Sequence, residues 1–289
     1  MGQLLQFVVT GLATGATYAL VGLGIALVFQ VTGVINFAQG HFVMLGALTF
    51  AILEENGTSA VPAALMALAG TTVIGLLVER LVIAPARGAQ IDRLIILTIG
   101  AAIVIEGAAL VAFGTQPRVA APFTEGVVRF GGVRLERQYL WVSLATILAV
   151  AAVWVFLTRT TLGKAMRGVA MDREAARLMG ISPRRMSLLV FTLAAALGAI
   201  GGVALAPIQH PDPGIGIALG LKGFTAAVIG GLDSPAGAVA GGLLLGVAEA
   251  VAAGYLPSGY KDAVAYGVLV LLLLLRPTGV LKTVRAVRV

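Results

Sequence analysis

The chain has 289 residues, of which 59% are hydrophobic and only 11% are charged, and its mean hydropathy is +1.00. A soluble domain carries about 25% charged residues, so this composition excludes a single water-soluble core and indicates that lipid surrounds much of the chain. The absence of cysteine excludes a disulfide framework and thiol chemistry. The net charge of +7 does not indicate nucleic-acid binding, because the basic residues lie in loops between apolar runs, where membrane topology accounts for them.

Nine apolar segments follow one another along the chain, most of them near the roughly 20 residues that cross a bilayer as a helix. They cover residues 4–30, 37–53, 60–83, 93–113, 138–157, 187–206, 217–231, 236–254 and 261–276. No basic region precedes the first segment, so we expect it to remain as a membrane helix and not to be a cleaved signal. The segment at 217–231 is short and rich in glycine and alanine, which favours a broken or re-entrant helix. The prediction is an all-α, polytopic transmembrane helical bundle of eight or nine spans, forming one domain over residues 1–289.

The distribution of Lys and Arg predicts the orientation, because cytoplasmic loops carry the excess of positive charge. One set of alternate loops holds 14 of the 20 basic residues: Arg80, Arg87, Arg93, the seven within 158–186, Arg276, Lys282, Arg285 and Arg288. The opposite set holds Arg118, Arg129, Arg134, Arg137, Lys222 and Lys261. Residues 158–186 and the C-terminus are therefore expected in the cytoplasm, and the N-terminus and a loop at 114–137 outside it. Alternating apolar residues around Gly131 and Gly132 predict a small hairpin in that loop, either packing on the helix ends or docking an external protein.

Two breaks interrupt the apolar pattern. Their residues of interest are Asn36, Gln39, Gly40 and His41 in the first, and Gly230, Gly231, Asp233, Ser234 and Gly237 in the second. Asn36 is predicted to cap the helix that follows it, and Ser234 to cap a helix that starts with Pro235. Capping alone explains these residues, but helix starts placed at depth would also present their dipole to a carboxylate substrate. A lone His41 with no partner at ligand spacing does not predict a metal site.

Glycines and acidic residues within the spans carry the next signal. Pairs four residues apart (Gly11 and Gly15, Gly198 and Gly202, Gly237 and Gly241, Gly242 and Gly246) predict close helix packing.

Glu106 and Glu249 fall inside apolar segments, and neither is expected to face lipid, where a charge costs at least about 2.5 kcal/mol. Each is either a pathway, gating or proton site or a hydrogen-bonding partner of a neighbouring helix. Glu79, followed by Arg80 at a helix end, is expected at the membrane interface.

The segment 158–186 holds seven Lys/Arg and two acids in an otherwise apolar chain. Residues 172–179 predict a short amphipathic helix with Ala175, Leu178 and Met179 on one face, and Gly180 is suited to end it. Because two helical turns are unstable alone in water, this face needs a partner: the end of the bundle, another protein, or lipid headgroups. The chain has no glycine-rich phosphate-binding loop, so any nucleotide that drives it must bind on another subunit.

Several motifs resemble those of known transport proteins. The coupling-loop motif of bacterial ABC importer permeases is similar to Gly163, Arg167, Asp172, Glu174, Ala175, Leu178 and Gly180 at their spacing here. The segments beginning at Gly11, Asn36 and Phe224, and Arg276-Pro277 with Gly279, look like those of branched-chain amino acid permeases. The resemblance covers nearly the whole chain and is nearest to the H-type subunit of the high-affinity leucine, isoleucine and valine system.

This resemblance implies a non-enzymatic permease subunit, multi-pass in the bacterial inner membrane, that imports branched-chain or related amino acids. Its implied partners are a second permease, two cytoplasmic ATPases that bind ATP and Mg, and an extracytoplasmic binding protein, with no cofactor in this chain. The ATPase-coupling residues would be the motif above together with Met179. Asn36, Gln39, His41 and Glu249 are predicted to line the substrate pathway. The alternatives are an ion-coupled secondary transporter that uses Glu106 and Glu249 without ATPases, and a non-transporting scaffold.

Overall fold

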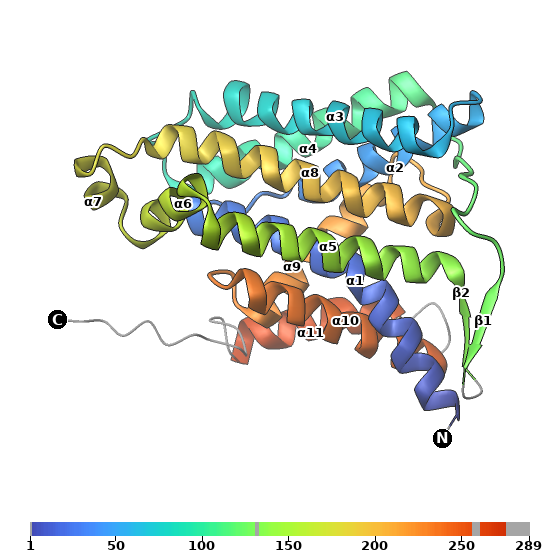
Figure 1. Cartoon of the computed structure of the whole chain (residues 1–289). Helices are drawn as coiled ribbons and strands as arrows, with labels where there is room; N and C mark the ends of the chain where they lie inside the picture. The colour runs from blue at the N-terminus through green and yellow to red at the C-terminus, as the bar shows by residue number, and fades with distance from the viewer. Residues whose placement is uncertain (1, 131–132, 256–260, 276–289) are drawn as a thin grey trace.

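A computed structural model describes residues 2–130, 133–255 and 261–275 of the chain, and within these it is a helical bundle with one short hairpin (Figure 1). The elements in order are α1 (Gly2–Thr32), α2 (Gln39–Glu55), α3 (Ala60–Val78), the π-helix η1 (Glu79–Ile83), α4 (Ile91–Phe113), β1 (Val127–Phe130), β2 (Val133–Glu136), α5 (Arg137–Arg159), α6 (Thr161–Met171), α7 (Arg173–Leu178), α8 (Pro183–Gln209), α9 (Ile215–Gly230), α10 (Pro235–Tyr255) and α11 (Lys261–Leu275). The all-α prediction is confirmed.

Each of the nine predicted apolar segments forms a helix, although not all are long enough to span a bilayer. Within the described residues, six are sufficiently long and apolar: Gln3–Thr32, Ala60–Ile83, Ile91–Phe113, Arg137–Arg159, Pro183–Gln209 and Pro235–Tyr255. The remaining three, α2, α9 and α11, have 17, 16 and 15 residues. The predicted shortness of the 217–231 segment is therefore correct, and α2 and α11 share it.

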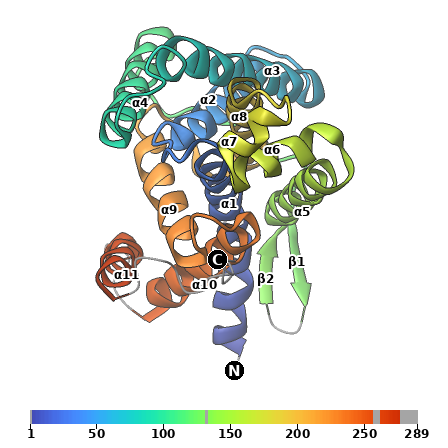
Figure 2. The same ribbon diagram turned by 90° about the vertical axis from the view of Figure 1, so that its left-hand side faces the viewer.

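Helix α1 occupies the centre of the bundle. Seen end-on, it is surrounded by α2, α5, α8, α9 and α10, while α3 and α4 form an outer layer on one side (Figure 2). Its middle residues Leu20, Val21 and Ala26 are fully buried. A membrane helix hydrophobic on every side can be buried in this way because its neighbours, and not water, cover all of its faces.

The glycine pairs place α1 against α10 at backbone distance. A side-chain carbon added to Gly15 would lie only 2.8 Å from the carbonyl oxygen of Gly242, and one added to Gly246 would strike the Cα of Gly15. Gly198 and Gly202 bring α8 equally close to Phe42 and Val43 of α2. The predicted close packing is confirmed at these positions, where small residues let helices associate without a hydrophobic driving force.

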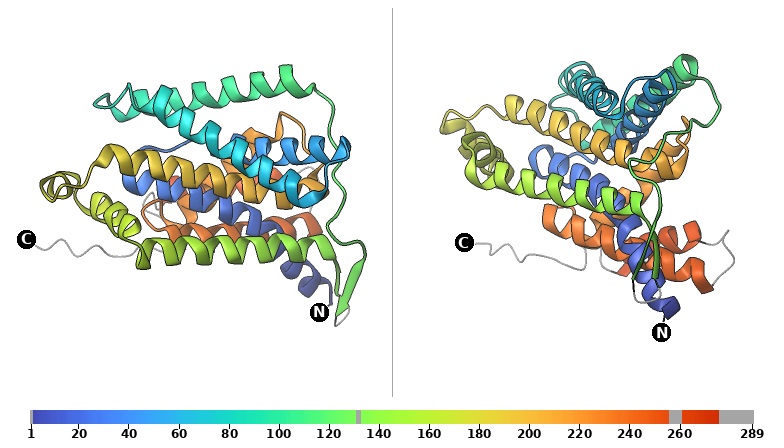
Figure 3. Two further views of the ribbon diagram at one scale, coloured as in Figure 1. Left: turned by 45° about the horizontal axis from the view of Figure 1, so that its top comes forward. Right: turned by 45° about the vertical axis from the view of Figure 1, so that its right-hand side comes forward.

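The connecting segments separate into two groups at opposite ends of the bundle (Figures 1 and 3). The hairpin lies beside the N-terminal end of α1, where the Gln6 side chain hydrogen-bonds the Arg134 backbone at 2.7 Å. Its register pairs Val128 with Leu135 and confirms the predicted hairpin. The segment with Arg87 lines the same pocket as Arg173 of α7, at the other end. This grouping agrees with the predicted loop sets, while the assignment of each end to the cytoplasm or the outside stays a prediction.

Lys222 was counted with one set of loops although it falls within the predicted 217–231 segment, and the loop assignment is wrong. It lies inside α9 and is only 7% exposed. In the sequence, a lysine within an apolar run suggests the end of a membrane helix. Here Lys222 is tolerated inside the helix because Glu249 and Asp262 neutralise its charge. Arg276, Lys282, Arg285, Arg288 and the Arg276–Gly279 motif lie outside the described residues.

The two predicted helix caps have different outcomes. Ser234 Oγ accepts a hydrogen bond from Gly237 N at 3.0 Å and Pro235 is the first residue of α10, as predicted. Asn36 is not the cap of α2, because that helix begins at Gln39 with Ala38 at the cap position. Asn36 Oδ1 instead accepts from Ala38 N at 3.1 Å, so its side chain closes the turn that precedes the helix.

Candidate functional site

The charged segment between α5 and α8 folds into two helices, of which only the second was predicted. Thr160 caps α6 by accepting from Gly163 N at 3.0 Å. Gly163 packs against the backbone of Phe156 and Leu157 in α5, and Met166 and Val169 are buried beneath α6. Gly163 therefore sets the sharp α5–α6 turn, and Arg167 is exposed on the outer side of α6.

Helix α7 has only six residues and is closed at both ends by specific caps. Asp172 Oδ1 accepts from the backbone N–H groups of Glu174 at 2.9 Å and Ala175 at 3.0 Å. At the other end Gly180 has a φ of +78°, Gly180 N donates to Arg177 O, and Ile181 N donates to Ala176 O. This paired arrangement needs a residue that tolerates the left-handed conformation, which confirms Gly180 as the terminating residue.

The two sides of α7 have different surroundings. Ala176 is 5% exposed and packs into the main core of the bundle together with Ile181. Leu178 is 90% exposed, Met179 is 81% exposed, and Ala175 is also exposed. The apolar face predicted from the sequence is therefore turned away from the bundle, and the residue that anchors α7 is one the prediction did not include.

A pocket of about 850 Å³ opens between α7 and the ends of α1, α4 and α8. Its lining residues are Thr32, Gly33, Val34, Ile83, Arg87, Gly88, Ala89, Ile91, Leu94, Arg173, Glu174, Arg177, Gly180, Ile181, Ser182, Pro183, Arg184 and Ser187. Glu174 and Arg177 form an exposed ion pair at 3.4 Å along α7. Sequence patterns did not predict this pocket, because it is built from three distant stretches of the chain, within 32–34, 83–94 and 173–187.

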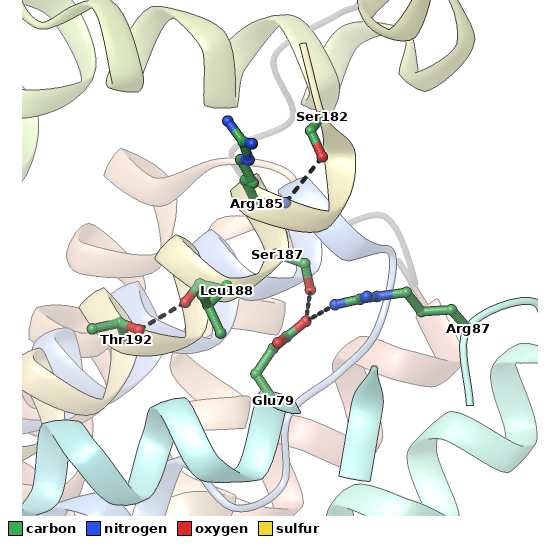
Figure 4. A network of polar contacts seen from close by, with 7 residues as sticks. All are labelled: Glu79, Arg87, Ser182, Arg185, Ser187, Leu188 and Thr192. Atoms are coloured by element: carbon green, nitrogen blue, oxygen red, sulfur yellow. Dashed lines mark hydrogen bonds and ion pairs between the residues drawn. The ribbon is translucent and has the colours of Figure 1, made fainter. Parts of the chain in front are cut away.

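Glu79 is buried beneath this pocket near the end of its helix, and its predicted depth at the membrane interface stays a prediction. It is 1% exposed, accepts a hydrogen bond from Ser187 Oγ at 2.9 Å, and forms an ion pair with Arg87 (Figure 4). The adjacent Arg80 is exposed and is not its partner. Glu79, the first residue of the π-helix that follows α3, thus makes a buried contact with Ser187 of α8. The charged pair Glu79-Arg80 in the sequence did not indicate this contact.

Asn36, Gln39 and His41, predicted to line the substrate pathway, lie together at the start of α2 and are at most 2% exposed. Gln39 Nε2 donates to Ala194 O at 2.8 Å, and His41 Nε2 lies 3.2 Å from Glu106 Oε2. Asn36 Nδ2, Gln39 Oε1 and His41 Nδ1 have no hydrogen-bond partner within the described part of the chain. In this conformation the cluster is enclosed, so its place on the pathway stays a prediction.

Glu249, the fourth predicted pathway residue, belongs to a buried charge cluster that joins four helices. Lys222 Nζ of α9 lies 2.7 Å from Glu249 Oε1 of α10, 2.8 Å from Asp262 Oδ1 of α11 and 3.2 Å from the Tyr18 hydroxyl of α1. Lys222 and Asp262 were missed as partners, because only the fold brings these positions together. A buried ion pair is costly to break, since one charge would be left without compensation.

The predicted helix-break residues have mainly packing contacts. Gly40 lies against Gly216 and Gly220 of α9, and Gly230 lies against Gly237 across the α9–α10 turn. Gly231 has a φ of +91°, and the Asp233 carbonyl accepts from Gln30 Nε2 at 3.1 Å. Among the residues that the structure describes, no group of three or more His, Cys, Asp or Glu could hold a metal ion.

Residues 7–273 match the family model of the branched-chain amino acid transport system permease component. The chain is 36% identical to the high-affinity branched-chain amino acid transport permease BraD of Pseudomonas aeruginosa and 33% identical to LivH of Escherichia coli, covering 96% of this chain and 95% of each relative. It is 27% identical to LivM of Escherichia coli over 93% of this chain and 68% of that protein. Among solved structures, a chain of PsaBC from Streptococcus pneumoniae in complex with Fab has a TM-score of 0.50 and 14% identity, with coverage of 93% and 91%, which shows a shared fold.

Proposed function

This chain belongs to the family of branched-chain amino acid transport permeases, with its H-type subunits as similar relatives, and we propose that it imports branched-chain or related amino acids as one membrane subunit of an ATP-driven importer. The multi-pass helical bundle supports this role. In the proposed assembly it pairs with a second permease, two cytoplasmic ATPases that bind ATP and Mg, and an extracytoplasmic binding protein. The membrane would be the bacterial inner membrane, with residues 158–186 on the cytoplasmic side and 114–137 outside.

The exposed apolar face of α7 is the observation that carries the proposal. Leu178 and Met179 are 90% and 81% exposed on a short helix that is capped at both ends and anchored by Ala176. Two large apolar side chains on a helix of this size need a covering surface. We assign that surface to an ATPase, with Ala175, Leu178 and Met179 as the contact and with Gly163, Asp172 and Gly180 shaping the segment.

The proposed mechanism converts a movement of the ATPases into a movement of helices. When ATP closes the ATPases, α7 is displaced and carries with it α8, which it joins through the three-residue connection after Met179. Helix α8 packs on α1, α2, α3 and α5, so its displacement shifts the bundle between outward and inward states. Arg167, exposed on the same segment, is proposed to make a polar contact to the ATPase, whereas Glu174 would act through its ion pair with Arg177 on α7.

Substitution of Leu178 tests this docking role. In the reconstituted importer, Leu178→Asp is expected to abolish substrate-stimulated ATP hydrolysis, because a buried apolar contact would receive an unpaired charge. Leu178→Met is the matched control and should retain stimulation, since it preserves apolar volume. Both variants should insert and purify like the parent chain. If Leu178→Asp hydrolyses ATP with normal substrate stimulation, α7 is not the docking element.

The alternative of an ion-coupled transporter is less well supported. It would use Glu106 and Glu249 as titrating sites, but Glu249 is paired with Lys222 and Glu106 with His41. The family match also supports the importer. Uptake by the purified chain alone in liposomes, driven by an ion gradient without ATP, would contradict the importer and establish the alternative.

A further inference from the structure

The pocket next to α7 goes beyond the proposed function, because it lies on the side of the helix opposite to the proposed ATPase contact. Residues four apart share one face of a helix, so Arg173 and Arg177 face together into the pocket, which Gly180 lines beyond the end of α7. Leu178 and Met179 are absent from the pocket lining and are exposed on the other face. A ligand in the pocket would therefore contact one side of α7 and leave Leu178 and Met179 on the other side free to bind the ATPase.

The pocket has a strong excess of positive charge. Four arginines line it, and Glu174 is its only acidic lining residue. Arg87 is neutralised by the buried Glu79, and Arg177 is paired with Glu174. Arg173 and Arg184 are exposed and have no ion pair within the described residues. The Nε of Arg87 is buried and has no hydrogen-bond partner within the described residues, so Arg173 and Arg184 are the guanidinium groups left accessible to a ligand.

Two helix N-termini add to this potential. Ile91 and Leu94 from the first turn of α4, and Ser182 and Pro183 at the start of α8, line the pocket. The cap residue of α4, Gln90, makes no side-chain hydrogen bond to the first turn. Backbone N–H groups at the start of a helix attract anions. The start of α4 contributes most of this effect, because at α8 Pro183 has no N–H and Ser182 Oγ already accepts from Arg185 N.

Most of the remaining lining is apolar, although Thr32, Ser182 and Ser187 contribute hydroxyl groups. Val34, Ile83, Ile91 and Leu94 line the pocket beside the arginines. Ile91 is 58% exposed at the start of α4, and Ile96 and Ile103, which lie on another side of that helix from Leu94, are 66% and 63% exposed. This combination fits an amphiphile with an anionic head and hydrocarbon tails better than a small polar anion.

We propose that this pocket binds the phosphate headgroup of an anionic phospholipid from the leaflet that surrounds this end of the bundle. The headgroup lies among Arg173, Arg184 and the start of α4, and the acyl chains follow the apolar side of α4. Basic pockets between membrane helices are suited to such headgroups. Occupancy would fix the position of α7 relative to α4 and α8, so lipid composition would tune the coupling between ATP hydrolysis and transport.

The test measures lipid binding by the full-length purified chain without ATPases, so its result does not depend on the docking proposal. Native mass spectrometry follows retention of phosphatidylglycerol and phosphatidylcholine as each is titrated into the detergent-solubilised chain. We expect preferential retention of phosphatidylglycerol. The double variant Arg173→Gln with Arg184→Gln should weaken that retention roughly 30-fold, since each basic residue near such a headgroup contributes a factor of about five.

A matched control removes the same charge elsewhere. Arg129 and Arg134 face each other across the hairpin at the opposite end of the molecule, and both are exposed. Arg129→Gln with Arg134→Gln should leave retention unchanged. Equal loss in both double variants, or no preference for phosphatidylglycerol in the parent chain, would overturn the site.

Two further measurements separate other occupants. If inorganic phosphate alone raises the unfolding temperature of the parent chain but not of the pocket variant, while phosphatidylglycerol is not retained, the ligand is a free phosphate and the lipid proposal is wrong. If cross-linking in the assembled importer joins positions 173 and 184 to an ATPase, with neither anion binding the isolated chain, the pocket is a protein contact and the proposal is again overturned.

Discussion

At the residue scale, the buried Lys222 charge cluster gives Glu249 a definite partner. Glu249 is 6% exposed, and its distance to Lys222 Nζ is shorter than that of Tyr18 or Asp262. Removing the Glu249 carboxylate would leave the buried Lys222 ammonium with less negative charge around it. Asp262, whose side chain is 50% exposed, would neutralise it only in part.

We predict that Glu249→Gln lowers the free energy of unfolding by about 3 kcal/mol, the low end of the cost of breaking a buried pair. Thermal unfolding of the purified chain, followed in detergent, measures this loss. The double variant Lys222→Met with Glu249→Leu should recover most of it, because both buried charges are then removed.

Uptake by the same double variant decides between the two roles of Glu249. Normal uptake by a stable double variant would show that the carboxylate stabilises the bundle and does not serve the pathway. Loss of uptake with normal assembly would instead support the predicted pathway role.

At the scale of single elements, Gly180 determines where α7 ends. Its φ of +78° is strained for residues that carry a Cβ, and a Cβ there would meet no neighbouring atom. The effect of a substitution is therefore conformational and not steric.

We predict that Gly180→Val frays α7 and reduces substrate-stimulated ATP hydrolysis severalfold, whereas Gly180→Asn retains most of it because Asn tolerates the left-handed conformation. The ATPase rate of the reconstituted importer is the measurement. Equal activity of the two variants would show that the end of α7 does not control coupling.

Helix packing offers a second comparison at this scale. Gly246→Ala places a Cβ against the Gly15 backbone and should destabilise the α1–α10 contact by about 1–3 kcal/mol. Gly100→Ala is the control, because its Cβ meets nothing within 4 Å and its helix propensity improves. An unfolding temperature that is lower for Gly100→Ala than for Gly246→Ala would contradict this view of the packing.

At the scale of the whole molecule, membrane orientation is open to a direct test, because the chain contains no cysteine. Leu178→Cys and Val128→Cys would place single thiols at exposed positions at opposite ends of the bundle. In spheroplasts that produce the chain without its ATPases, so that position 178 is not covered, we predict that an impermeant thiol reagent labels Val128→Cys before permeabilisation but labels Leu178→Cys only after it. The reverse pattern would invert the proposed topology.

Local signals in the sequence were sufficient to predict the apolar helices, the hairpin and the C-terminal end of α7, but not α6 or the Asp172 cap. The apolar runs, Ser234 with Pro235, and Gly180 act through neighbouring backbone, so their spacing in the chain indicates their role. Partners across the bundle were not predictable in this way. Only the packing of helices distant in the chain brings together Lys222 and Glu249, Glu79 and Ser187, and the arginines of the pocket. In the sequence alone, a charged residue whose partner is distant resembles a residue of a loop or of the membrane interface.

The length of α8 has one more consequence. Its 27 residues correspond to about 40 Å, enough to reach from Ser182 beside α7 to the opposite end of the bundle, where the Ala204 carbonyl accepts from Gln138 Nε2 at 2.9 Å. A stiff rod of this length magnifies small rotations, so tilting it by about 10° at one end would sweep the other end through roughly 7 Å. In the proposed topology, a small displacement of α7 on the cytoplasmic side would therefore become a large displacement at the outer end of α8.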